Sequence, residues 1–199
     1  MEKRFKLNWL FVSVMTLGCA FGFVACDDDN SPVPPTTKDA WGAFKGKMQV
    51  IPANPAPALA NDAVLGTDVT ATVKNDTVYF ESFPIKDLVA SLVPEGSVEE
   101  IVKAIGEVKY KIGYKAVLNA AQDSVYMTLD PKPLEIAVPM GETATLAVEV
   151  TVSAMGKGSY ELSSRNLKLD VKADKVTVNE ADFPAFPASV FKFAMKKGK

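Results

Sequence analysis

The strongest constraint on the fold is a strict alternation of apolar and polar side chains. Between Thr143 and Ala154 every second residue is apolar, and the residues between them are mostly polar or small. A period of two is typical of a strand with one buried and one solvated face. The same alternation recurs from Tyr110 to Leu118 and from Phe191 to Met195. We therefore expect a mainly β fold.

Turn signals separate these segments. Asn75-Asp76 predicts a hairpin, because both residues tolerate a positive φ angle, and residues 120–123 predict another turn. Two further turns are predicted at Gly156-Lys157-Gly158 and at residues 172–175. The result is roughly nine antiparallel strands in a meander, forming either a two-layer sheet or a barrel-like sheet.

Two short inserted helices interrupt the strands, at about residues 86–93 and 98–105. Their apolar residues recur at helical spacing. Ser97 and Glu100 predict a capping box at the start of the second helix, and Gly106 stands where a C-cap glycine belongs.

The N-terminus has the layout of a lipoprotein signal. A basic start precedes an apolar run from Leu7 to Ala25, which ends at Cys26. Cys19 is the competing lipidation site, but cleavage before Cys26 gives a chain that is polar from its second residue. We expect a signal peptide at 1–25, a lipid on Cys26 as the membrane anchor, an acidic and Pro-rich tether at 26–38, and a single mainly β domain at 39–199.

The residues after the lipidated cysteine suggest a destination. Cys26-Asp27-Asp28-Asp29-Asn30 resembles the acidic export signal of surface lipoproteins in Bacteroides-type bacteria. The resemblance implies a lipid-anchored protein displayed on the outer face of the outer membrane, with Asp27, Asp28 and Asp29 as the export signal. The alternative is that these aspartates only solvate the tether.

Composition excludes several kinds of chemistry. The chain has no histidine, and its two cysteines are Cys19 in the signal peptide and Cys26 at the lipidation site, so we expect no Ser-His-Asp triad, structural disulfide or cysteine zinc site. No motif predicts a cofactor or a metal site. With 22 basic and 24 acidic residues in dispersed order, we expect no nucleic-acid partner. The basic cluster at residues 196–199 is interpreted as a frayed terminus.

The candidate ligand contacts are aromatic. Trp41 is the only tryptophan after the signal, and Phe183 and Phe186 lie in a Pro-rich loop. Exposed aromatic rings can stack on sugars or anchor a protein partner. The alternative for all three is packing against the core.

From Trp41 onward the chain resembles a family of uncharacterised Bacteroides-type lipoproteins, a domain of unknown function. The resemblance rests on Gly42 to Met48, on Tyr114 to Pro133 together with Leu134, and on Leu167 to Asn179. It implies no activity, substrate or catalytic residue.

These observations predict a non-enzymatic binding or interaction module for a glycan, a small ligand or an envelope protein. Two alternatives stay open. One is a structural subunit or accessory of a surface assembly, in which the C-terminal strand could be donated to a neighbour. The other is a carboxylate-dependent glycoside hydrolase, which needs two opposed acids and no histidine.

Overall fold

The structure is a computed structural model that describes residues 33–52, 66–90, 92–93, 95–140 and 144–199. The described residues of the unit Pro35–Lys199 form eleven strands and two α-helices. The helices are α1 (Lys86–Ala90) and α2 (Val98–Ile105). The strands are β1 (Gly42–Pro52), β2 (Thr67–Lys74), β3 (Thr77–Phe80), β4 (Tyr110–Leu118), β5 (Ser124–Pro131), β6 (Leu134–Met140), β7 (Ala144–Ala154), β8 (Lys157–Glu161), β9 (Asn166–Val178), β10 (Ala181–Asp182) and β11 (Ser189–Lys197).

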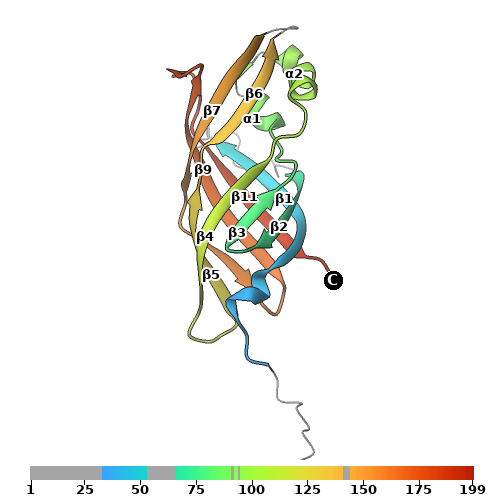
Figure 1. Cartoon of the computed structure of the whole chain (residues 1–199), viewed down its shortest axis with the longest axis vertical. Helices are drawn as coiled ribbons and strands as arrows, with labels where there is room; N and C mark the ends of the chain where they lie inside the picture. The colour runs from blue at the N-terminus through green and yellow to red at the C-terminus, as the bar shows by residue number, and fades with distance from the viewer. Residues whose placement is uncertain (1–32, 53–65, 91, 94, 141–143) are drawn as a thin grey trace, which may run out of the picture. The chain divides into compact units, whose positions relative to one another are not determined.

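Eight strands form a closed antiparallel barrel (Figure 1). Neighbours around it run β11, β1, β2, β3, β4, β5, β8 and β9, and β9 pairs again with β11. The mainly β prediction is confirmed, and the choice that the sequence left open is decided in favour of a barrel. The hairpin between β2 and β3 is also confirmed, because Asn75 and Asp76 have φ angles of 48° and 54°.

The remaining strands extend the sheet beyond the barrel. The second half of β9 pairs with β7, β7 pairs with β6, and the two-residue β10 pairs with β9. Helix α2 packs against β6 and α1 (Figure 1). Leu134, Ile136 and Val150 are buried in this part, so the extension carries its own share of the core.

Both helices lie where the sequence predicts them, although α1 ends at Ala90. Gly106 ends α2 with a φ of 73°, and its N–H donates to the Val102 carbonyl. The predicted capping box is wrong. Ser97 belongs to the 3-10 turn Glu95–Ser97 and has a helical φ/ψ pair, so its hydroxyl makes no cap hydrogen bond.

Two predicted turns are wrong because the chain continues along the sheet at both places instead of reversing. β7 and β8 both pair with the same edge of β9, and between them the Met155 N–H donates to the Asp170 carbonyl over 3.0 Å. Gly156, with a φ of 101°, therefore bends the chain between β7 and β8, and both strands stay on the same edge of β9. β9 also runs unbroken through residues 172–175, where the register of β7 shifts between Thr151 and Val152. Small and polar residues accommodate a β-bulge as readily as a turn.

The strand β6 was not among the predicted strands. Its sequence alternates, but Pro133 and Pro139 argue against a strand in the middle of a sheet. β6 ends the path of paired strands, and an edge strand tolerates a missing N–H.

Side chains fill the barrel interior. Phe44, Phe80, Phe191 and Phe193 are each at most 1% exposed. The ring centroids of Phe80 and Phe193 lie 5.1 Å apart, as do those of Phe83 and Tyr110. Eight strands give an interior that side chains can fill, so the described interior of this barrel is a packed core.

The prediction of a frayed C-terminus is wrong for Lys196 and Lys197, which belong to the last strand. β11 includes Lys196 and Lys197, and the Lys197 ammonium donates to the Asp39 carbonyl over 2.8 Å. The Gly198 N–H donates to the Ala43 carbonyl. The last strand is thus held on both sides, and it cannot be donated to a neighbour without opening the barrel. None of the helices in the described part of the chain has the length and apolarity to span a bilayer.

Candidate functional site

The barrel carries a concentration of lysines on its outer wall. Along β1, β8, β9 and β11 alternate side chains enter the core, so the residues between them point outward. We call the outward lysines of these four neighbouring strands the lysine face. Its members are Lys45, Lys47, Lys157, Lys168, Lys192 and Lys196. The other two outward lysines of β9, Lys172 and Lys175, form ion pairs with Asp174 and Asp182 and are not counted in it.

The strand register brings lysines from distant parts of the sequence together. Lys45 lies directly opposite Lys196. Lys168 lies between Ala194 of β11 and Ser159 of β8, and Ala194 in turn lies opposite Lys47. The face therefore collects charges from both ends of the described chain.

Most of this charge is uncompensated. Lys47 pairs with Asp68 over 2.8 Å, and both side chains are largely exposed. Within the described residues Lys45, Lys168, Lys192 and Lys196 form no ion pair. Asp170 lies opposite Lys192 in the register without an ion pair between them. The lysine face consequently offers several free ammonium groups to an anion.

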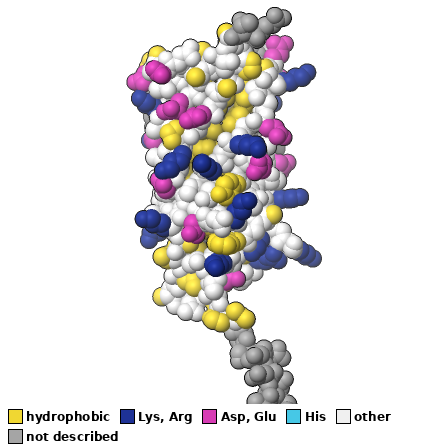
Figure 2. All heavy atoms as spheres, in the orientation of Figure 1, with side chains coloured by type: hydrophobic (Ala, Val, Ile, Leu, Met, Phe, Trp, Pro, Cys, Tyr) yellow, Lys and Arg dark blue, Asp and Glu magenta, His cyan; other side chains and the backbone are white. Residues whose placement is uncertain are grey.

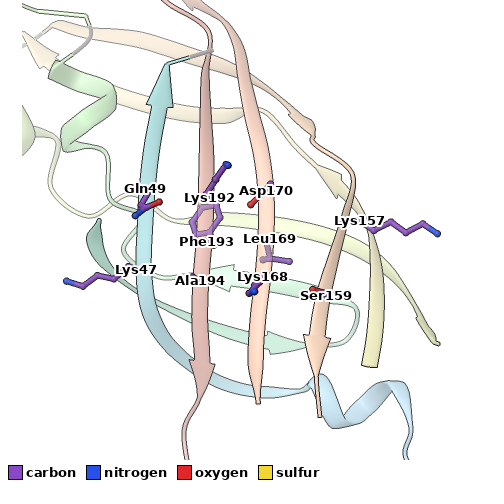
Figure 3. A pocket seen from close by; sticks show the side chains of 10 residues that line it. All are labelled: Lys47, Gln49, Lys157, Ser159, Lys168, Leu169, Asp170, Lys192, Phe193 and Ala194. Carbon is purple, nitrogen blue, oxygen red and sulfur yellow. The ribbon is translucent and has the colours of Figure 1, made fainter. Parts of the chain in front are cut away.

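A shallow groove of about 340 Å³ runs across the lysine face (Figure 3). Lys47 and Lys157 stand at its two outer edges, and Lys168 and Lys192 lie between them. Outward positions inside the groove hold the small residues Ala194 and Ser159, which leave space between the longer lysine side chains. Such a surface suits an extended anion better than a small molecule that needs enclosure.

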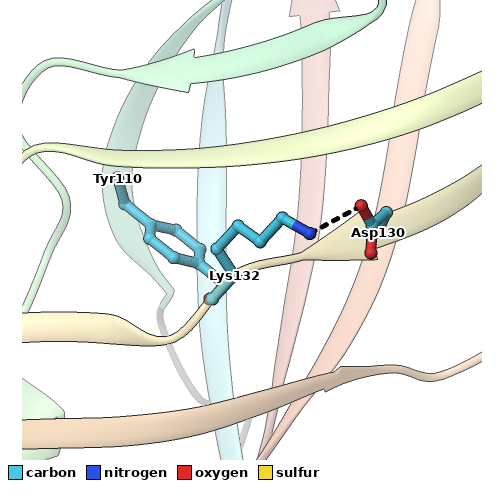
Figure 4. A network of polar contacts seen from close by, with 3 residues as sticks. All are labelled: Tyr110, Asp130 and Lys132. Atoms are coloured by element: carbon cyan, nitrogen blue, oxygen red, sulfur yellow. Dashed lines mark hydrogen bonds and ion pairs between the residues drawn. The ribbon is translucent and has the colours of Figure 1, made fainter.

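A second groove, of about 570 Å³, lies where β3, β4 and β6 meet. The Tyr110 hydroxyl donates to the Lys132 carbonyl over 2.8 Å at its wall, and Lys132 pairs with Asp130 over 2.9 Å (Figure 4). Glu81 and Glu135 both line it. A glycosidase acid needs an apolar setting that keeps it protonated. Glu81 is instead 74% exposed and paired with Lys109 over 3.2 Å, which suits a solvated structural role.

The perturbed tyrosines belong to the core. Burial raises the pKa of Tyr110 strongly. Burial also raises the pKa of Tyr114 to about 12, with Asp76 adding to the rise. The buried Tyr114 hydroxyl has no hydrogen-bond partner among the described residues. A phenol held neutral in this way does not serve as a base at neutral pH.

The structure separates the aromatic residues predicted as ligand contacts. Trp41 precedes β1 at the end where Phe44 pairs with Lys197, whereas Phe186 precedes β11 at the end where Pro52 pairs with Ser189. Trp41 and Phe183 are partly buried against the core, and Phe186 is 9% exposed. Lys38 lies 5.5 Å from the centroid of the Trp41 ring. These three residues therefore do not form one site.

Charge is unevenly distributed over the molecule. On the side drawn in Figure 2, which is the side of β2, β3 and β4, acidic side chains are frequent toward the end that carries β6 and β7, and lysines are interspersed with them and continue over the barrel. Glu99, Glu135 and Glu149 belong to the extension and its helices. These glutamates make the extension less favourable for an anion than the lysine face.

The lysine face is the feature that the sequence did not predict. Its lysines lie far apart along the chain, so the sequence shows only dispersed charge and no basic cluster on these strands. Only the pairing of β1, β8, β9 and β11 brings them together. Cys26 and Asp27, Asp28 and Asp29 lie outside the described residues, so the lipid anchor and the export signal stay predictions.

Comparison with known protein families finds a match over most of the described chain. The family described as "Domain of unknown function (DUF4840)" matches residues 39–178. No curated protein and no solved structure matches the chain. The match covers most of the chain, from the turn before β1 to the end of β9. The chain therefore belongs to the DUF4840 family.

Proposed function

We propose that this protein is a lipid-anchored lipoprotein of the outer-membrane surface and that its barrel is a non-enzymatic binding module for anionic ligands. Two independent features support this. The signal sequence with Cys26 and the three following aspartates supports the location. The uncompensated lysine face supports the activity.

The pair Lys45–Lys196 carries the proposal. Like charges directly opposite each other on neighbouring strands destabilise a sheet, and this row continues with Thr70 on β2 and Asn166 on β9, neither of which is acidic. A bound carboxylate, sulfate or phosphate would remove the repulsion and form charge-assisted hydrogen bonds. Repulsion between Lys45 and Lys196 in the free protein, relieved when an anion binds, favours an anion-binding surface.

The alternatives have less support. Enzymatic hydrolysis of a glycan needs two acids in contrasting environments, and the groove with Glu81 and Glu135 is open and solvated. A structural subunit that donates its last strand would have to unpair β11 from both β1 and β9.

Titration with inorganic polyphosphate tests the binding proposal. The mature chain should bind, and its affinity should fall steeply as salt rises from about 0.05 to 0.5 M, because screening weakens exposed charges. Lys168→Gln with Lys192→Gln should reduce affinity about tenfold or more. The matched control is Lys103→Gln with Lys111→Gln, which removes two exposed lysines elsewhere. Equal losses in both variants, or no binding by the wild type, would contradict the proposal.

Fractionation of cells tests the location separately. Cys26→Ser should abolish palmitate incorporation and membrane attachment, while Cys19→Ser leaves both intact. Alanine at Asp27, Asp28 and Asp29 should keep the protein membrane-bound but protect it from protease added to whole cells. Undiminished cleavage of that triple variant would show that the aspartates only solvate the tether.

A further inference from the structure

An exposed aromatic residue lies in register with the lysine face. Tyr126 of β5 is opposite Ser159 of β8, Ser159 is opposite Lys168, and Lys168 is opposite Ala194. Strands in a sheet are about 4.8 Å apart, so the Tyr126 backbone is roughly 10 Å from that of Lys168. The ring and the nearest free ammonium thus fall within reach of one short polymer segment.

The ring of Tyr126 is available for contact. The residue is 41% exposed, and its cross-strand neighbour Val117 is 56% exposed. Most other aromatic rings with described contacts, such as Phe80 and Phe193, pack into the core. Within the described residues the Tyr126 ring takes part in no ring stacking and its hydroxyl in no hydrogen bond. An aromatic and a β-branched side chain side by side form an apolar strip beside the groove.

We infer that the lysine face binds a carboxylated sugar polymer and that Tyr126 stacks against one of its rings. This inference rests on the proposed function and names its ligand class. A pyranose ring offers a face of C–H groups whose partial positive charge is attracted by the negative face of an aromatic ring. Uronate carboxylates would then meet Lys168 and Lys192, and Ser159 lies between ring and charges with a hydroxyl suited to a sugar hydroxyl.

The lysines and the aromatic strip together distinguish three classes of polymer. A polyphosphate chain carries charge but no apolar face, so it depends on the lysines alone. A neutral polysaccharide offers rings without charge, so it lacks the attraction of the lysines. A uronate polymer uses both the aromatic strip and the lysine face, and the row Tyr126–Ser159–Lys168 presents them side by side.

Parallel titrations with polygalacturonate and inorganic polyphosphate test the inference on the mature chain. Tyr126→Ala should weaken polygalacturonate binding about 3- to 10-fold, the range expected for loss of one stacking contact, and should leave polyphosphate binding unchanged. Tyr126→Phe retains the ring and should bind both polymers like the wild type. Lys168→Gln with Lys192→Gln should weaken both. Thermal unfolding of each variant shows that the barrel is intact.

The outcomes separate the two proposals. Unchanged polygalacturonate binding in Tyr126→Ala, or an equal loss for both polymers, overturns the role of Tyr126 while anion binding stands. Wild-type binding to polyphosphate without binding to polygalacturonate overturns the carboxylated-sugar assignment alone. Binding to neither polymer overturns the proposed function and this inference together.

Discussion

Gly46 shows how a single residue fixes the approach of two strands. It lies opposite Met195 in the pairing of β1 with β11. A Cβ added at Gly46 would lie 2.5 Å from the Met195 Cα and would also press on the backbone of Ala194. Because backbone atoms cannot turn aside as a side chain can, glycine is required there by close packing.

We therefore predict that Gly46→Ala destabilises the barrel by about 1–3 kcal/mol, measured as the free energy of unfolding in urea. Gly113→Ala on β4 is the matched control, since its Cβ would meet the Asp130 carbonyl at an ordinary 3.5 Å. That substitution should be neutral or slightly stabilising, because alanine loses less backbone entropy on folding. Equal losses at both positions would mean that the approach of β1 to β11 is not tight.

At the scale of an element, β1 and β11 combine a stabilising ladder with an electrostatic cost. Nine residue pairs join them, from Phe44–Lys197 to Pro52–Ser189, and one of these is Lys45–Lys196. The inward members of the ladder, such as Phe44 and Phe193, hold the strands in register through the core. The proposed anion binding by the outward lysines therefore comes at a small cost to stability.

Lys45→Thr should stabilise the free protein by a few tenths to about 1 kcal/mol, which raises the melting temperature by roughly 1–3 °C. The same change should weaken polyphosphate binding. Lys115→Thr on β4 controls for the strand preference of threonine, because Lys115 lies opposite Thr128 and has no like-charge partner there.

The stabilisation by Lys45→Thr should shrink in about 0.5 M salt, where screening reduces the repulsion in the wild type. An equal gain from Lys115→Thr, or a gain that does not depend on salt, would show that repulsion between Lys45 and Lys196 is not the cause.

The whole molecule depends on β11 to close the barrel. The family match ends at residue 178, before this strand. Without β11, β1 and β9 would each expose an unpaired edge, and Phe191 and Phe193 would leave the core. Unpaired strand edges promote association between chains.

The fragment 39–178 should therefore fail to form a stable monomer. Circular dichroism should show no cooperative thermal transition, and size-exclusion chromatography should show aggregates. The fragment 36–199 is the control and should unfold cooperatively. A folded, monomeric 39–178 fragment would show that closure by β11 is dispensable.

The sequence by itself determined the class of most segments, with β6 as the strand that it missed. Alternation identified the strands from Tyr110 to Leu118 and from Phe191 to Met195, helical spacing identified α1 and α2, and Asn75-Asp76 identified a hairpin. These are local properties, because side-chain direction and turn geometry depend on neighbouring residues. The signals at Gly156 and at residues 172–175 failed because a bulge and a turn draw on the same residues.

The tertiary structure alone decided closure and the lysine face. Closure requires β11 to pair with β1, about 150 positions earlier in the chain, and no local pattern encodes such a partner. Register then determines which outward side chains are neighbours, so Lys45 and Lys196, or Tyr126 and Ser159, meet only in the folded barrel. A sheet surface is assembled across strands, and for that reason a site built on one cannot be found along the sequence.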